Sequence, residues 1–336
     1  MKRKIIYIYL GIALISLFAC IKNGGEIISK QGPYMGKPLP GADPELFAPG
    51  IVSNGYQTRD VAITPDGNEL YFGARSSRYY TILVSKKTDG VWSKPEVMKQ
   101  MQNPDYMNIE PAINADGSKF FFLSNRPDSA LGVEYGQQDI WVMDRLGDDW
   151  SEPYNLGPPV NTSKPEFYPS LTNDGTLYFT RNDENSQTAY IYRSRLIEGR
   201  YQEPEKLPEQ VNCGLNHYNA FIAQDESYII VPTVGREDSY GGTDYYIVFR
   251  DENDNWSQPI NMGDKVNTPD TFEYSAYVTR DGKVLFFMSR RLADKPEKLT
   301  YEYLISEHNK PESGNPSIYW MDAGFIDDLR ESAVFE

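Results

Sequence analysis

Hydrophobic and polar residues alternate along five similar stretches of the chain, each with a short polar turn in its middle. The first stretch is Val61–Phe72 and the last is Tyr277–Phe287. Alternation with a period of two predicts half-buried β-strands, and an Asp-Gly pair between two such strands predicts a hairpin. The turn aspartates are Asp66, Asp116, Asp174, Asp225 and Asp281, so the pattern recurs after 50, 58, 51 and 56 residues. Glu226 replaces the usual Gly in the fourth copy.

Two further strands are expected after each hairpin. The third strands are predicted over Thr81–Ser85, Asp139–Met143, Ala189–Tyr192, Asp244–Val248 and Ser317–Met321. In four copies a fourth strand is expected to begin at Trp92, Trp150, Tyr201 and Trp256. Each of these residues is followed three positions later by Pro, which is tolerated at an exposed sheet edge.

The fifth copy has no such fourth strand, and a segment ahead of the first copy resembles one. Four strands per repeat form the blade of a β-propeller. We therefore predict an all-β protein, a β-propeller of five four-stranded blades. In this interpretation residues 45–53 supply the outer strand of the last blade and close the ring. Six blades remain the alternative. The 25 Tyr, 15 Phe, 26 Gly and 23 Pro agree with many strands and frequent turns.

The N-terminus has the features of an export signal. Three basic residues precede an apolar run over Ile5–Ala19, which is short for a membrane-spanning helix. Residues Leu17–Cys20 resemble a bacterial lipobox, in which the Cys is acylated. We predict a signal peptide over 1–19, lipidation of Cys20, a linker over 20–44, one propeller domain over 45–330 and a tail over 331–336. An ordinary secretory signal is the alternative.

The net charge is strongly negative and narrows the classes of partner. It is −15 for the whole chain and −18 without residues 1–19, which carry three basic residues and no acidic one. Such a surface repels phosphate backbones, so no nucleic-acid partner is expected. We expect a monomer.

Polar residues lie at two equivalent positions of each first strand, eight and six places before the turn aspartate. The pairs are Thr58 and Asp60, Asn108 and Glu110, Glu166 and Tyr168, His217 and Asn219, and Glu273 and Ser275. Residues two apart on a strand share a face, and the first strands of a propeller line its central channel. We therefore expect these side chains to converge, with Arg59, at one mouth of the channel.

This convergence suggests a ligand-binding site of Arg59, Asp60, Asn108, Glu110, Glu166, Tyr168, His217, Asn219 and Glu273. Paired carboxylates can act as acid and base or hold a divalent cation such as calcium. The candidate catalytic groups are Asp60, Glu110, Glu166, His217 and Glu273. The alternative is structural, with these side chains bonding the loops of adjacent blades. No cofactor is expected, because the chain lacks nucleotide-binding, zinc and nucleophile-elbow motifs.

Two other features recur or interrupt the repeat. Five arginines follow the second strands, for which we predict salt bridges within or between blades, with Asp139 or Asp244 as candidate partners; they are Arg75, Arg126, Arg181, Arg236 and Arg290. Insertions occur at 127–138 and 291–316, and the second could form a lid over one channel mouth.

The motifs Pro65–Phe72, Ser124–Pro127 and Asp139–Asp144 resemble the TolB-type, WD40-like repeats known as PD40 in bacterial envelope proteins. The resemblance covers roughly residues 50–325. It implies a scaffold, and members of the family include peptide-binding and glycan-associated proteins. Together with the lipobox, it leads us to expect a lipid-anchored protein of the bacterial envelope, periplasmic or surface-facing at the outer membrane, whose propeller binds a protein or a glycan. It does not transfer one function, since propellers host many. The alternative hypothesis is a carbohydrate-active hydrolase or lyase with its site at the channel mouth.

Overall fold

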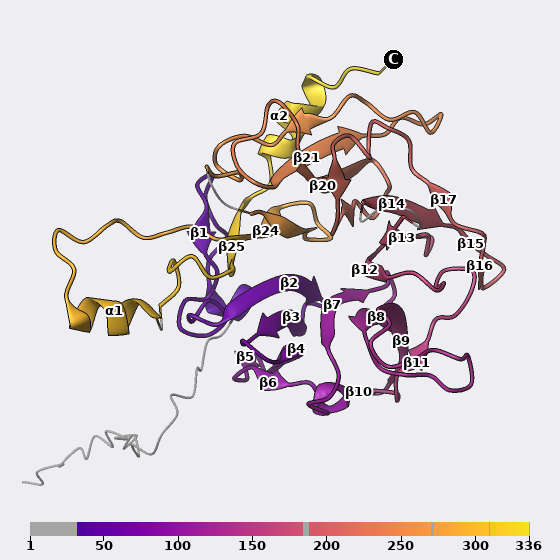
Figure 1. Cartoon of the computed structure of the whole chain (residues 1–336), viewed down its shortest axis with the longest axis horizontal. Helices are drawn as coiled ribbons and strands as arrows, with labels where there is room; N and C mark the ends of the chain where they lie inside the picture. The colour runs from indigo at the N-terminus through magenta and orange to yellow at the C-terminus, as the bar shows by residue number, and fades with distance from the viewer. Residues whose placement is uncertain (1–31, 184–187, 270–271, 309, 336) are drawn as a thin grey trace, which may run out of the picture.

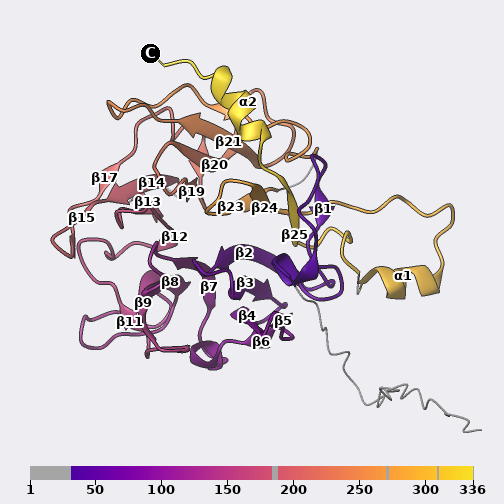
Figure 2. The same cartoon turned by 180° about the vertical axis from the view of Figure 1, so that it is seen from behind.

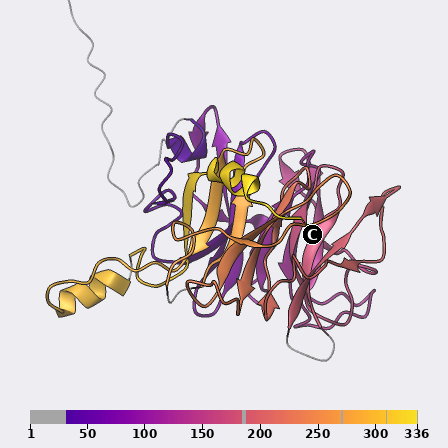
Figure 3. The same ribbon diagram turned by 90° about the horizontal axis from the view of Figure 1, so that it is seen from above.

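The computed structural model describes residues 32–183, 188–269, 272–308 and 310–335. Apart from one separate two-stranded hairpin, its strands form five small antiparallel sheets arranged around a central axis, which is viewed end-on in Figure 1 and from behind in Figure 2. Seen from above, the sheets stand side by side (Figure 3). The protein is a five-bladed β-propeller, and the fold predicted from the repeats is confirmed.

Each blade runs from an inner strand to a short outer strand. Blade 1 contains β2 (Gln57–Ile63), β3 (Glu69–Arg75), β4 (Tyr80–Thr88), β5 (Val91–Trp92) and β6 (Glu96–Val97). Blade 2 contains β7 (Asn108–Ile113), β8 (Lys119–Ser124), β9 (Asp139–Leu146), β10 (Asp149–Trp150) and β11 (Tyr154–Asn155). Blade 3 contains β12 (Glu166–Leu171), β13 (Leu177–Asn182), β14 (Ala189–Ser194) and β17 (Glu205–Lys206), with the separate hairpin β15 (Leu196–Ile197) and β16 (Arg200–Tyr201).

The last two blades follow the same plan. Blade 4 contains β18 (Asn216–His217), β19 (Phe221–Ile222), β20 (Tyr228–Val234), β21 (Asp244–Phe249) and β22 (Ile260–Asn261). Blade 5 contains β23 (Tyr274–Val278), β24 (Val284–Ser289), β25 (Ser317–Asp322) and β1 (Glu45–Leu46). Short helices lie outside the blades: η1 (Tyr34–Gly36), η2 (Lys99–Met101), α1 (Tyr301–His308) and α2 (Phe325–Glu331).

The outer strands begin later than the sequence predicted. In blades 1, 2 and 4 the Trp precedes the outer strand, which starts directly after the Pro, and the same order holds for Tyr201 in blade 3. The physical reason is that the three Trp side chains are buried, with 3–5% of their surface exposed, so they belong to the core between blades. The Pro that follows three residues later lies just before the outer strand, where its missing N–H costs no ladder hydrogen bond.

Ring closure follows the prediction. β1 pairs antiparallel with β25, with Glu45 opposite Trp320 and Leu46 opposite Tyr319. The next residue, Phe47, is fully buried and makes edge contacts with the rings of Phe286 and Trp320 at 4.9 and 5.1 Å between centroids. The N-terminal segment thus completes the sheet made by the C-terminal strands, as Figure 1 shows.

Five hydrophobic clusters form the core, one at each interface between blades. Blades 1 and 2, for example, share a cluster that contains Tyr71, Phe120, Phe122, Trp141 and Trp150. The equivalent clusters join blade 2 to 3, 3 to 4, 4 to 5 and 5 to 1. The aromatic residues of the repeats therefore hold blades against their neighbours.

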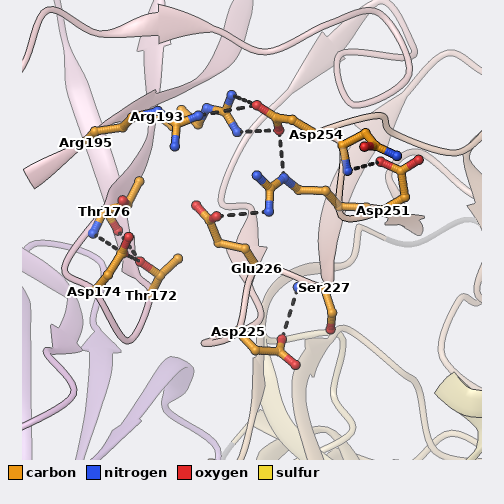
Figure 4. Close-up of polar contacts among 12 residues, drawn as sticks. Thr172, Asp174, Thr176, Arg193, Arg195, Asp225, Glu226, Ser227, Asp251 and Asp254 are labelled. Carbon is orange, nitrogen blue, oxygen red and sulfur yellow. Dashed lines mark hydrogen bonds and ion pairs between the residues drawn. The ribbon is translucent and has the colours of Figure 1, made fainter.

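The turn aspartates stabilise the hairpins through short-range hydrogen bonds. Asp174 accepts from the Thr172 hydroxyl and from the Thr176 N–H at 3.0 Å, and Asp225 accepts from the Ser227 N–H at 3.0 Å (Figure 4). These bonds satisfy turn N–H groups that no strand pairs.

Glu226 stands where the other turns have Gly, and it adopts the left-handed conformation with φ of 58°. This conformation is costly for a residue with a Cβ. Its carboxylate accepts from the Tyr178 hydroxyl at 2.9 Å and pairs with Arg250 at 3.1 Å. Arg250 also binds Asp254, which pairs with Arg193 of blade 3 (Figure 4). Glu226 thus joins an ionic network between blades 3 and 4.

The insertion at 291–316 projects outward from blade 5 as an arm that carries α1 (Figures 1 and 3). It does not cover the channel, so the lid hypothesis is wrong. Helix α1 has no buried residue, so it does not pack against the blades. A hydrogen bond from Asn315 to the Gly55 carbonyl fixes the base of the arm beside residue 55.

The closure contact provides a test of the fold. Phe47→Ala should lower the free energy of unfolding by about 3–5 kcal/mol, because it leaves a cavity between blades 1 and 5. Urea denaturation measures this change. Leu39→Ala is the matched control, since Leu39 is 54% exposed, and should shift stability by less than about 0.5 kcal/mol. Equal stabilities for both variants would contradict closure by the N-terminal segment.

Candidate ligand-binding site

Every inner strand is interrupted by a bulge at one repeat position, six places before the turn aspartate. The residues there have left-handed φ values of 57°, 62°, 51°, 54° and 68°; they are Asp60, Glu110, Tyr168, Asn219 and Ser275. The pairing register shifts at the same point in blades 1, 2, 3 and 5, and blade 4 is divided there into β18 and β19. Each such conformation costs on the order of 1 kcal/mol, so contacts elsewhere must offset it.

The five bulge side chains meet in the channel and form a buried polar network. All are buried, with 2–7% of their surface exposed. The Glu110 carboxylate accepts from the Tyr168 N–H at 2.7 Å and from Asn219 Nδ2 at 3.2 Å. Asn219 also donates to Ser275 Oγ at 3.1 Å. Side chains from all five blades therefore occupy the centre of the propeller.

Arg59 supplies the positive charge of this network. Its guanidinium donates to Asp60 at 2.8 Å and to Glu110 at 2.7 Å, and it stacks on the Tyr274 ring at 4.5 Å. Burial is the largest single effect and lowers the pKa of Arg59, but Asp60, Tyr274 and Glu110 together outweigh it, so the pKa is raised. Arg59 thus neutralises part of the acidic pair that the sequence predicted.

A glycine makes room for Asp60 in the neighbouring strand. A Cβ at Gly73 would lie 2.7 Å from Asp60 Oδ2 and 2.9 Å from Ile109 Cγ1, closer than real contacts allow. Gly73 is therefore required by the close approach of this carboxylate.

The pKa of Glu110 is raised to about 7. Burial is the largest cause, the attraction of Arg59 opposes it, and repulsion by Asp60 adds to it. Near neutral pH this carboxyl group exchanges a proton, so the charge at the centre of the channel depends on pH.

Four predicted site residues lie away from this network, because the bulge breaks the two-residue periodicity on which their placement rested. Glu166 accepts from Arg181 at 2.8 Å and from the Thr162 N–H at 3.0 Å. Asn108 accepts from Arg126 at 2.6 Å. His217 and Glu273 are fully buried. The expectation that both residues of each pair face the mouth is therefore wrong.

His217 and Glu273 have internal partners. His217 accepts from the Gly214 N–H at 2.8 Å and lies 3.1 Å from the Ala189 carbonyl, and burial lowers its pKa to about 4. Glu273 accepts from the Ser289 hydroxyl at 3.0 Å and the Thr268 hydroxyl at 2.6 Å. These contacts tie the inner strands to adjacent loops and strands.

The recurring arginines do not pair with Asp139 or Asp244. Arg181 binds Glu166 and Arg126 binds Asn108, both on the inner strand of their own blade. Asp139 accepts from Gln137 and Asn155, and Asp244 accepts from two backbone N–H groups, which leaves neither carboxylate facing an arginine.

A pocket of about 340 Å³ opens above the polar network at the mouth where the inner strands begin. It is lined by Arg59, Tyr218, Asn219, Phe272, Tyr274 and Arg290. The opposite mouth is narrower, with a cavity of about 40 Å³, and Arg280 closes it by donating to the Asn114 and Ala115 carbonyls. The first mouth therefore offers a ligand-sized space directly above the polar network.

The sequence interpretation included two lining residues, Arg59 and Asn219, and missed the aromatic ones. Tyr218 and Tyr274 lie seven places before the turn aspartate, as does Arg59. An aromatic residue stands at that position in three of the five copies, with Phe167 as the third. This recurrence is the feature of the sequence from which the aromatic lining could have been predicted.

The divalent cation considered from sequence does not fit the observed arrangement. Within the described ranges no three His, Cys, Asp or Glu side chains gather as a metal site. Arg59 already lies between the two channel carboxylates.

Comparisons with known proteins bear on the fold. No family model matches the chain, and no curated protein matches it. Solved structures similar to it include a protein of Agrobacterium tumefaciens assigned as TolB, with 14% identity, a TM-score of 0.45, and coverage of 80% of this chain and 90% of that one. TolB from Acinetobacter baumannii has 13% identity, a TM-score of 0.43, and coverage of 79% and 57%. A GH62 hydrolase in complex with xylotriose has 10% identity, a TM-score of 0.44, and coverage of 81% and 94%. TolB propellers are thus among the structures that the chain is similar to, and identities this low do not indicate a function.

The raised pKa of Glu110 predicts a pH-dependent stability. Its folded pKa of about 7 exceeds the ordinary value of 4.5, so the folded state holds the proton more tightly. The associated stability is present below pH 4.5 and is lost as the pH rises through 7. Glu110→Gln should therefore reduce the fall in unfolding free energy between pH 5 and pH 8 by about 1–3 kcal/mol, measured by urea denaturation at both pH values.

Glu166 has a raised pKa of about 7 as well, mainly through burial, so some pH dependence should remain in the Glu110→Gln variant. Exposed Glu152→Gln is the matched control and should preserve the wild-type slope. A slope in Glu110→Gln equal to that of wild type would contradict the assignment.

Proposed function

We propose that this propeller is a binding protein that captures the chain terminus of a partner protein at the channel mouth. The observation that supports this function is the pocket in which two guanidinium groups and three aromatic rings surround a floor of polar side chains. Two arginines can donate hydrogen bonds to one carboxylate, and the rings can contact an apolar side chain next to it. A C-terminal carboxylate after an apolar residue has both features.

The charges favour a ligand with a single carboxylate. Arg59 has two acceptors already, whereas Arg290 is exposed and uses its Nε on the Gly314 carbonyl at 2.9 Å. The chain carries a net charge of −15, which repels a polyacidic ligand at long range. Beyond about 8 Å that repulsion is screened at physiological salt, so one carboxylate beside two arginines is still stabilised.

The carboxylates of the site support binding more than acid–base catalysis. Catalysis by a carboxylate pair requires two such groups flanking a substrate in a pocket. Glu166 and Glu273 are fully buried, and Glu110 accepts three hydrogen bonds from the protein. These groups stabilise the propeller, and the guanidinium groups of Arg59 and Arg290 line the pocket.

A peptide pair tests this function. The fluorescein-labelled peptide Gly-Ser-Gly-Gly-Leu-Phe should bind with a free C-terminal carboxylate, and its C-terminal amide should bind at least about tenfold more weakly, since a charge-assisted bond is lost. Fluorescence anisotropy measures both affinities.

Variants locate the binding site. Arg290→Ala and Tyr274→Ala should each weaken the carboxylate peptide severalfold. Arg236→Ala is the control, because Arg236 follows the second strand of blade 4, as Arg290 follows that of blade 5, and does not line the pocket. Equal affinity for acid and amide, or equal binding by all variants, would contradict the proposal.

We also propose that the protein is exported and held at the bacterial envelope by acylation of Cys20. Residues 1–19 and Cys20 lie outside the described residues, so the support is the sequence of the N-terminus. Among the described residues, no helix has the length and apolar character needed to cross a membrane. Two acyl chains on one Cys would give stable anchoring, which one chain does not.

Replacement of the Cys tests the anchor. Cys20→Ser should move the protein from the membrane fraction to the soluble fraction, or leave the precursor uncleaved, as judged by fractionation and immunoblotting. Cys213→Ser is the matched control and should leave the distribution unchanged. Identical fractionation and mobility of Cys20→Ser and wild type would rule out lipidation.

A further inference from the structure

A second and larger cavity lies on the flank of blade 1, away from the channel mouth. Its volume is about 510 Å³, within the range of roughly 300–1,000 Å³ typical of small-molecule sites. Three segments form its walls: the residues that lead into β2, the turn between β3 and β4, and the loop that follows η2. It shares no lining residue with the pocket at the channel mouth.

Four tyrosines line this flank cavity. Tyr56 is 62% exposed and Tyr79 is 43% exposed, while Tyr80 and Tyr106 are half-buried. Each ring presents an apolar face together with a hydroxyl group. Exposed aromatic residues gathered in a concave surface are unusual for a site without a ligand.

One of the lining residues also carries a buried hydroxyl group without a partner. Thr58 lines the cavity, is 1% exposed, and its Oγ1 has no hydrogen-bond partner within the described ranges. Its backbone N–H is bonded to the Pro316 carbonyl at 2.9 Å, which fixes its position. An unsatisfied buried hydroxyl costs roughly 1–3 kcal/mol. Thr58 Oγ1 has almost no exposed surface, so a ligand hydroxyl removes that cost only when neighbouring side chains of the cavity wall shift to admit it.

The lining is nearly uncharged. Arg75 is the charged side chain among the lining residues, and its guanidinium stacks on the Tyr80 ring at 4.7 Å. The other polar side chains there are amides and hydroxyls, such as Asn54 and Asn103. The cavity therefore suits a neutral ligand that combines flat apolar faces with a rim of hydroxyl groups.

We infer that the flank cavity binds a neutral pyranose unit of an oligosaccharide. The apolar C–H face of a pyranose stacks on a tyrosine ring, and its hydroxyl groups pair with amides and with Thr58. A proline-rich peptide also stacks on tyrosines, but proline rings carry no donor or acceptor for a hydroxyl at the base of the cavity. A nucleic acid would meet an acidic protein with one arginine at this site.

Titration with sugars tests this inference. The probes are neutral tetrasaccharides of glucose, mannose, galactose and xylose in α and β linkages, measured by isothermal titration calorimetry on the protein without residues 1–20. At least one should bind saturably at one site. Tyr79→Ala should weaken that sugar by about tenfold or more, through loss of a stacking face.

Thr58→Val separates a ligand contact from a structural role. Valine has nearly the same shape and lacks the hydroxyl, so the melting temperature should stay equal or rise. Affinity for the sugar should fall about fivefold to tenfold, as expected for one lost hydrogen bond. Tyr301→Ala is the control, because Tyr301 is 74% exposed on α1 and does not line the cavity, and it should bind like wild type.

Three outcomes would overturn the inference. None of the tetrasaccharides binds, or the bound sugar is insensitive to both Tyr79→Ala and Thr58→Val, or a proline-rich decapeptide binds at this cavity in place of the sugars. The peptide pair for the channel mouth is unaffected by these variants, so failure here is distinguishable from failure of the proposed function.

Discussion

The bulge in every inner strand is the constraint on which the rest of the structure depends. A regular strand would direct alternate side chains into the two faces of its blade and leave the axis of the ring open. The left-handed residue turns one side chain of each blade toward the axis instead. Five conformations with unfavourable φ values are maintained because the five side chains bind one another and Arg59.

This filled centre determines where a ligand can bind. A channel blocked by Glu110 and Asn219 cannot pass a chain, so the wide mouth becomes a pocket with a polar floor. Arg280 closes the other mouth through backbone carbonyls of blade 2. A second concave surface of ligand size lies on blade 1, where the loop after η2 meets the turn between β3 and β4. The two proposed sites differ in chemistry, because two arginines line the first and the second is nearly uncharged.

Much of the fold could be predicted because its determinants are local. Asp66 and its four equivalents fix a hairpin by bonding the N–H two residues on, and this requirement is visible in a short sequence motif. Closure by the segment around Phe47 was also predictable, since the fifth repeat lacks an outer strand. The site was less accessible. Glu166 and Glu273 were assigned to the channel on a period of two, and one extra residue in the strand reverses the face on which they lie. Nothing in the sequence of a single strand indicates a left-handed Tyr168, because its conformation depends on contacts with Glu110 from another blade.

Amide hydrogen exchange tests the filled channel most directly. The Tyr168 N–H donates to Glu110 and the Asn219 N–H donates to Thr180 Oγ1 at 3.1 Å, both at the centre of the ring. If the polar network closes the channel, these two amides should exchange only through global unfolding, with protection equal to that of the most protected strand amides. Exchange of either amide at rates typical of solvent-exposed turns, in protein that remains folded, would show an open channel and contradict the structure of the site.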